Sequence, residues 1–176
     1  MSGSLTSDVF KDDIGFSIHP IAAVTKKTNL KNVKFAIEGN EEKLYIVKEL
    51  FPNSQIIKKE AKPLYHASAV IASNFLVGIY NLAENLLKEA GFFNTEILLS
   101  LVESTINNIK ENGSINALTG PVERADIKTI ETHLNALPIE YKEIYLSISK
   151  HLIKIAEIKN KTNDYYQLLQ LFHEQG

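Results

Sequence analysis

The feature that most constrains the fold is the stretch of residues 63–83, which contains no formally charged side chain when histidine is counted as neutral. This is about the length that a helix needs to cross a bilayer. An isolated lipid-facing helix tolerates few polar side chains, and this stretch contains five, namely His66, Ser68, Ser73, Asn74 and Asn81. We therefore predict a central helix that protein buries on most sides, and no membrane span.

The sixty residues before this stretch have the pattern of an α/β segment. Short runs suited to strands occur at 14–18, 33–37 and 54–58, and apolar residues at helical spacing lie between the second and third runs. Strand, helix and strand joined by short links are typical of a parallel sheet. Three strands and one helix leave a sheet face uncovered. We therefore expect residues 1–60 to be the last part of a larger, Rossmann-like sheet.

After residue 60 every predicted element is a helix. Pro63 suits the first turn of a long helix, and Gly91 suits its end. Asp126 is a suitable amino-terminal cap for a later helix. Further helices are predicted over residues 95–112, 127–137, 139–159 and 163–173. The predicted fold class is an α/β remnant of a Rossmann sheet over residues 1–60, followed by an all-α domain over residues 61–176, so the chain is mostly helical.

Composition and motifs exclude several classes of function. The net charge is -2, and no basic patch indicates a nucleic-acid partner. The chain has no cysteine, which excludes disulfides, thiolate metal sites and a cysteine nucleophile. The five histidines lack metal-ligand spacing, and no G-x-S-x-G motif is present. The first ten residues do not have the pattern of a signal peptide, so we expect a cytoplasmic protein.

The glycine pattern with which a Rossmann fold binds a dinucleotide is also absent. The motif G-x-G-x-x-G allows the tight turn that brings the backbone close to the pyrophosphate. No two of the eight glycines in this chain are two residues apart. We therefore predict no cofactor-binding residue in this chain, no metal site and no tight binding of NAD(P).

Polar residues of the predicted long helix form the first candidate site. At about 100° per residue, Lys62, His66, Ser73, Asn74 and Asn81 fall within roughly a third of the helix circumference. They are either satisfied buried polar groups or the wall of a ligand cleft into which His66 and Asn74 project. Histidine suits proton transfer near neutral pH, and an asparagine amide can bind a carbonyl or a carboxylate.

Two further groups are candidates. Thr119 and Gly120 begin a turn in which backbone amides could be exposed, and Arg124 offers a guanidinium to a carboxylate or phosphate. The alternative is an ordinary interhelical turn with Arg124 in a surface ion pair. His19 and Pro20 end a strand expected to be parallel, where open α/β sheets place ligands, although such a histidine can also be structural. The helical histidines are expected at the surface, namely His133, His151 and His173.

Several segments recur together, in this order, in one known family. They are Ser2–Leu5, Ser17–Pro20, Phe35–Gly39, Ala61–Val70, Ala72–Asn74 and Leu118–Pro121. They resemble a bacterial family of Rossmann-like oxidoreductases whose carboxy-terminal half is a domain of unknown function. That family is similar in plan to pyrroline-5-carboxylate reductase and, more distantly, to 6-phosphogluconate and β-hydroxyacid dehydrogenases. The match covers nearly the whole chain, and residues 61–74 are its most specific part.

The resemblance implies an amino-terminal domain that binds NADP or NAD, followed by a helical domain that forms a homodimer and closes the active-site cleft. His66 and Asn74 would be catalytic, and the residues that bind substrate would be His19, Ser73, Thr119, Gly120 and Arg124. The family's glycine loop precedes the position of Met1. We therefore expect the carboxy-terminal portion of a reductase or dehydrogenase for a small polar metabolite, inactive alone. The alternative is a non-catalytic helical module for dimerisation or binding.

Overall fold

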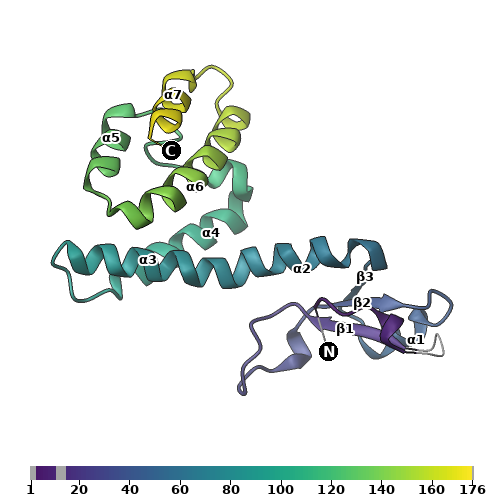
Figure 1. Ribbon diagram of the computed structural model, residues 1–176. Helices are drawn as coiled ribbons and strands as arrows, with labels where there is room; N and C mark the ends of the chain where they lie inside the picture. Colours follow the sequence, from purple (N-terminus) through teal and green to yellow (C-terminus); the bar gives the residue numbers. More distant parts are fainter. Residues whose placement is uncertain (1–2, 11–14, 176) are drawn as a thin grey trace. The chain divides into compact units, whose positions relative to one another are not determined.

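The computed structural model describes residues 3–10 and 15–175, and the chain divides into two compact units, Met1–Asn81 and Leu82–Gly176 (Figure 1). The division lies inside the long helix, whereas the predicted boundary near Glu60 marks the point where strands give way to helices. Ser2 and Ile14, which belong to segments quoted above, lie outside the described residues.

The first unit contains a three-stranded sheet of order β1-β2-β3 among its described residues. Its strands are β1 (Phe16–Pro20), β2 (Phe35–Gly39) and β3 (Ser54–Ile56). Strands β2 and β3 are parallel, as predicted, but β1 is antiparallel to β2, so the prediction of a parallel strand is wrong for β1. A parallel connection usually crosses the sheet with an α-helix. The described link from β1 to β2 contains only the 3-10 turn η2 (Leu30–Asn32).

One face of this sheet is covered by the helix α1 (Leu44–Leu50). Leu44 and Val47, three residues apart, are buried against Phe35 and Ile37, which alternation places on the same face of β2. Burying side chains of this size contributes about 1.5–3 kcal/mol each. By the same alternation Glu38 belongs to the other face of the sheet.

The predicted long helix is continuous from α2 (Lys62–Val70) through the π-helical turn η4 (Ile71–Phe75) to α3 (Leu76–Glu89), after the short 3-10 turn η3 (Lys59–Ala61). Pro63 lies in its first turn, and Gly91, with φ 89°, follows its end, as predicted.

The expectation that protein buries this helix on most sides is wrong within the single chain. None of the described residues of η4 or α3 is buried, and Leu64 and Val77 are 78% and 70% exposed. Ile71, Phe75 and Ile79 are exposed as well, so the first unit leaves this side of the helix uncovered. By length and composition alone, the helical span Lys59–Glu89 could cross a membrane.

The second unit is helical, with α4 (Ile97–Ala117), α5 (Ile127–Ala136), α6 (Ile139–Lys159) and α7 (Tyr166–Glu174). Helix α4 is interrupted at Gly113, whose φ is 75°. Asp126 caps α5 as predicted, because its Oδ1 accepts a 3.1 Å hydrogen bond from the Thr129 backbone N–H.

Helices α5, α6 and α7 lie side by side (Figure 1), and an apolar core holds them together. Its buried members come from these helices and from the turns beside them, namely Val122, Ile130, Leu134, Leu146, Ile153, Ala156, Tyr165, Leu168 and Phe172. Helix α4 contributes no buried residue among those described. His133, His151 and His173 are exposed, as predicted.

Candidate functional site

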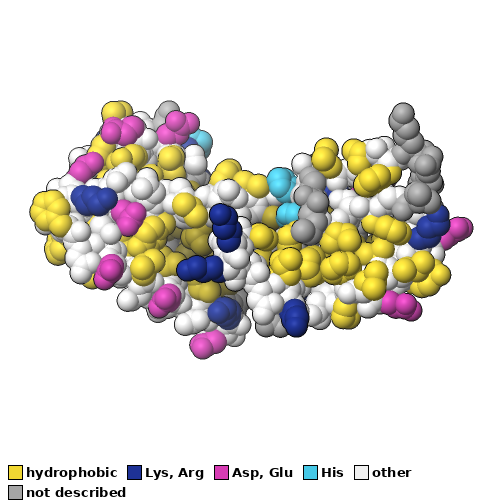
Figure 2. Space-filling view, turned by 90° about the horizontal axis from the view of Figure 1, so that it is seen from below, with side chains coloured by type: hydrophobic (Ala, Val, Ile, Leu, Met, Phe, Trp, Pro, Cys, Tyr) yellow, Lys and Arg dark blue, Asp and Glu magenta, His cyan; other side chains and the backbone are white. Residues whose placement is uncertain are grey.

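A pocket of about 690 Å³ in the first unit brings together four of the predicted site residues. Its polar lining among the described residues consists of His19 at the end of β1, His66 on α2, and Ser73 and Asn74 on η4. The rest of the lining is apolar and comes from the segment after β1 and from the long helix. Histidine side chains lie among apolar ones on the face that Figure 2 shows. The predicted arrangement, with His66 and Asn74 on one groove, is therefore present.

His19 is held by two aromatic neighbours on α2. Its Nδ1 lies 2.7 Å from the hydroxyl of Tyr65, and the two rings meet edge to face. The ring of His66 lies 5.9 Å from that of His19, between centroids. Burial first, and then the electrostatic influence of the neighbouring His66 and Lys62, lower the pKa of His19 below its ordinary value. The imidazole of His19 is therefore neutral at neutral pH.

The π-helical turn η4 presents Ser73 and Asn74 to the pocket. Ser73 Oγ donates a 2.6 Å hydrogen bond to the carbonyl of Ala69 and lies 3.0 Å from Asn74 Oδ1. Such turns insert an extra residue into an α-helix and are frequent at functional sites. The extra residue also changes the helical phase, so a wheel drawn at 100° per residue fails beyond it. Asn81, which the wheel placed on the same stripe, is exposed and does not line the pocket.

The sequence did not predict a buried ion pair between Lys62 of α2 and Glu38 of β2. Lys62 is 1% exposed, and its Nζ donates to the carbonyl of Leu5 and to Ser17 Oγ, and lies 3.5 Å from Glu38 Oε2. Glu38, 3% exposed, also accepts hydrogen bonds of 2.9 Å and 2.6 Å from the backbone N–H and the hydroxyl of Ser7. Buried charges require such partners. The network therefore ties the amino-terminal segment to the sheet and to α2.

Gly3 is buried beside the two histidines of the pocket. A Cβ built on it would overlap the ring of His66 and would lie 3.1 Å from His19 Nε2. Any larger residue would therefore push the His66 ring aside. The resemblance includes Gly3 in one of its segments but gives it no role.

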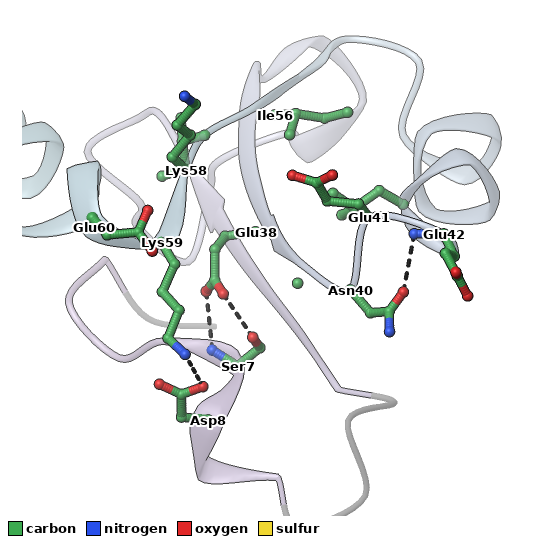
Figure 3. Close-up of a pocket in the computed structure, with 13 residues that line it drawn as sticks. Ser7, Asp8, Glu38, Asn40, Glu41, Glu42, Ile56, Lys58, Lys59 and Glu60 are labelled. Carbon is green, nitrogen blue, oxygen red and sulfur yellow. Dashed lines mark hydrogen bonds and ion pairs between the residues drawn. The ribbon is translucent and has the colours of Figure 1, made fainter.

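A second pocket, of about 570 Å³, lies where β2 and β3 end, between Asn40 and the segment after β3 (Figure 3). In the register of β1 with β2, Pro20 pairs with Phe35 and Phe16 with Gly39. The two pockets therefore lie at opposite ends of the sheet.

The second pocket is rich in carboxylates and does not fit the diphosphate of a dinucleotide. Its charged residues are Asp8, Glu38, Glu41, Glu42, Glu60, Lys58 and Lys59. Lys59 forms an ion pair with Asp8, and its hydrogen bond lowers the pKa of Asp8 (Figure 3). The strand-to-helix turn carries Glu41 and Glu42 before a helix of seven residues, so it would repel a phosphate instead of binding it.

Thr119, Gly120 and Arg124, the other predicted site residues, belong to the second unit and are not in the lining of the histidine pocket. Thr119 and Arg124 are exposed, and Gly120 has φ 100°. The ion pairs formed by the described residues do not include Arg124. The role of these three residues in binding substrate stays a prediction.

The turn that carries Arg124 is fixed by its neighbour Glu123. Glu123 Oε1 accepts a 2.7 Å hydrogen bond from Asn160 Nδ2 and lies 3.3 Å from Lys159 Nζ. The hydroxyl of Tyr165 donates a 2.7 Å hydrogen bond to the Glu123 carbonyl. The hydrogen bond from Asn160, followed by the interactions with Lys159, lowers the pKa of Glu123. These contacts fix the backbone of the turn that carries Arg124.

The sequence model of a domain of unknown function, DUF2520, matches residues 33–152. Protein TM1727 from Thermotoga maritima shares 32% identity and a TM-score of 0.75, over 90% of this chain and 68% of that protein. A Bacteroides fragilis protein described as "putative NADP oxidoreductase BF3122" shares 24% identity and a TM-score of 0.73, over 87% of this chain and 63% of its own, a likeness of fold alone. No curated protein matches the chain. The chain thus spans about two thirds of the two solved structures.

Proposed function

The chain belongs to the DUF2520 family, and on that premise we propose that it is the carboxy-terminal part of an NAD(P)-dependent reductase or dehydrogenase for a small polar metabolite. The observation that carries the proposal is the pocket in which His19 and His66 meet Ser73 and Asn74. The fold shared with a protein described as an NADP oxidoreductase supports the same class, and NADP as its cofactor.

The residues of this chain act on the substrate side of such a reaction. A carbonyl or imine that is reduced needs a proton at its oxygen or nitrogen. His66 donates or orients that proton, and the Asn74 amide hydrogen-bonds a carbonyl or carboxylate. His19 faces the same space, and Ser73 lies within hydrogen-bond distance of Asn74. The cofactor is held by residues outside this chain.

The lining of the pocket indicates the size and polarity of the substrate. No lysine or arginine is among the described residues that line it, and most of the lining is apolar. A small molecule with one reducible polar group and a short apolar part suits this surface. Thr119, Gly120 and Arg124 remain proposed substrate-binding residues, with Arg124 available to an anionic group.

We also propose a homodimer through the helical part. Helices α3 and α4 have no buried residue among those described, and large apolar side chains are exposed along them, namely Leu76, Val77, Ile79, Ile97, Leu99, Leu101, Ile106, Ile109 and Ile115. A second copy of the chain would cover this surface. Light scattering without detergent should give about twice 19.7 kDa. A clean monomer would contradict the proposal, and so would a chain that dissolves only in detergent.

Calorimetric titrations of the purified chain test the assignment of roles. NADPH should not bind with a dissociation constant in the low micromolar range, because the chain offers no glycine turn for the diphosphate. Pyruvate or 1-pyrroline, as a small carbonyl and a small imine, should bind weakly, and Asn74→Ala should abolish the heat. Tight binding of NADPH would contradict the proposal that residues outside this chain hold the cofactor.

The alternative function is a non-catalytic helical module for dimerisation or binding. The observation that favours it is the exposed apolar surface of α3 and α4, which suits a partner surface and requires no chemistry. A stable dimer that binds neither pyruvate nor 1-pyrroline would support this alternative over the reductase.

A further inference from the structure

Tyr65 is the nearest hydrogen-bonding partner of the pocket's histidines, yet it does not line the pocket. Its hydroxyl lies 2.7 Å from His19 Nδ1, and its ring packs edge to face on the imidazole at a centroid distance of 5.7 Å. Since Tyr65 is not among the residues that line the pocket, its hydrogen bond to His19 is the route by which it acts on the pocket.

The protons of this pair can be assigned from the chemistry of its two groups. Burial raises the pKa of Tyr65, so its hydroxyl stays a phenol. Burial lowers the pKa of His19, so its imidazole is neutral and has one bare nitrogen and one N–H. A phenol is a better donor than acceptor, and a bare imidazole nitrogen is a good acceptor. The hydroxyl of Tyr65 therefore donates to Nδ1 of His19, and the imidazole proton resides on Nε2.

A proton on Nε2 of His19 is available as a hydrogen-bond donor to a ligand in the pocket. Nδ1 is occupied by Tyr65, and His19 itself lines the pocket. A Cβ on Gly3 would overlap the His66 ring and lie 3.1 Å from His19 Nε2, so the glycine allows the two imidazoles to approach each other. Since Tyr65 occupies Nδ1, Nε2 is the ring nitrogen of His19 that remains for a ligand. A fixed Nε2–H donor beside His66 matches the need of a carbonyl or imine for hydrogen-bond donors.

We propose that Tyr65 is a positioning residue, which holds His19 in the Nε2–H tautomer so that the imidazole presents an N–H donor to the reducible group of the substrate. The inference deepens the reductase function proposed above and rests on it for the identity of the ligand. The tautomer itself is a property of the free chain.

The second unit contains a matched control for this pair. His133 Nδ1 lies 2.8 Å from the hydroxyl of Tyr145, with the rings edge to face at 6.0 Å. His133 is exposed and belongs to α5, whereas His19 is partly buried in the pocket. Tyr65→Phe and Tyr145→Phe therefore remove the same atom from two similar pairs in one molecule.

Nitrogen-15 NMR of the histidine rings in the full chain at about pH 8, well above the ordinary pKa of histidine, tests the proposal. Long-range nitrogen–proton spectra distinguish the two neutral tautomers. In the unsubstituted chain His19 should show a protonated Nε2 and a bare Nδ1. Tyr65→Phe should replace this single form by a mixture, and Tyr145→Phe should leave the His19 signals unchanged. Backbone spectra of both variants verify that the fold is retained.

The proposal is overturned if His19 carries its proton on Nδ1, if it is already a mixture, or if Tyr65→Phe leaves it unchanged. It is also overturned if Tyr145→Phe alters His19 as much as Tyr65→Phe does. These outcomes are separate from the failure of the reductase function, because no ligand is present. A chain that shows the expected tautomer but binds neither pyruvate nor 1-pyrroline would retain the role of Tyr65 on His19 and would lose the substrate.

Discussion

The two units bury different kinds of side chain. The second unit has a core of nine buried, mostly aliphatic and aromatic residues around Ile130 and Phe172. The first unit has a smaller apolar cluster under α1, and it also buries the charged pair of Lys62 and Glu38 with Ser17. The difference indicates that apolar burial stabilises the second unit, whereas in the first unit a polar network orders the segment beside the histidine pocket.

The two units each contain a histidine–tyrosine pair, and the two pairs differ in their surroundings. His19 with Tyr65 and His133 with Tyr145 have nearly the same hydrogen-bond length and ring geometry. His19 lines a pocket beside a second histidine, whereas His133 is exposed. A hydrogen bond between histidine and tyrosine therefore does not by itself indicate a functional site. The pocket and the second histidine distinguish the pair of His19 from the pair of His133.

The largest expected effect is the loss of apolar burial in the second unit. Phe172→Ala should lower the free energy of unfolding of this unit by about 3–5 kcal/mol, because Phe172 is fully buried in the core. Phe93→Ala is the control, since Phe93 is 87% exposed and should change stability by less than about 0.5 kcal/mol. Urea unfolding followed by NMR signals of each unit measures both. Equal effects of the two substitutions would show that burial of Phe172 does not stabilise the second unit.

Removal of the buried ammonium should have the next largest effect, and in the first unit. Lys62→Met should cost about 3 kcal/mol, because Glu38 would remain charged and buried without its ion-pair partner. Lys58→Met, at an exposed position, is the control. The double variant Lys62→Met with Glu38→Gln should recover part of the loss, since the uncompensated charge is then removed. A stable Lys62→Met chain would show that the network does not hold the first unit together.

The smallest effect concerns the acid stability of the second unit. The hydrogen bond from Asn160 is the main reason why the pKa of Glu123 is lowered in the folded state. The contribution of Glu123 to the free energy of unfolding is therefore fully present above the unfolded pKa of about 4.3, and it is lost as the pH falls through the folded pKa. Glu123→Gln should therefore destabilise the unit at neutral pH, and the difference from the unsubstituted chain should vanish in acid. Urea midpoints over a pH series measure this, with Glu131→Gln as an exposed control. A constant difference at every pH would refute the assignment.

Local patterns predicted much of the helical architecture. The predicted helix over residues 139–159 coincides with α6, and Asp126 caps α5 as expected, because apolar periodicity and caps are encoded within a few residues. The same periodicity placed His66, Ser73 and Asn74 on one side of the long helix, and they share one pocket with His19.

Contacts between distant segments were not predictable in the same way. The hydrogen bond between His19 and Tyr65 joins residues 46 apart, and that of Lys62 with Ser17 joins residues 45 apart, so no local signal marks either. The antiparallel direction of β1 depends on a pairing between segments far apart in the chain. The apolar periodicity of α3 does not encode which other surface, if any, covers the helix, so its exposure was not predicted.

Binding of substrate in the histidine pocket of the first unit can be measured by NMR of the nitrogen-15-labelled chain titrated with pyruvate and with 1-pyrroline. We predict saturable shifts at the rings of His19 and His66 and at the side chain of Asn74, with His133 and Tyr145 unmoved. His66→Ala should weaken binding by about tenfold, the loss expected for one hydrogen bond. No saturable shift at His19 and His66 with either probe, or an equal response at His133, would contradict the claim.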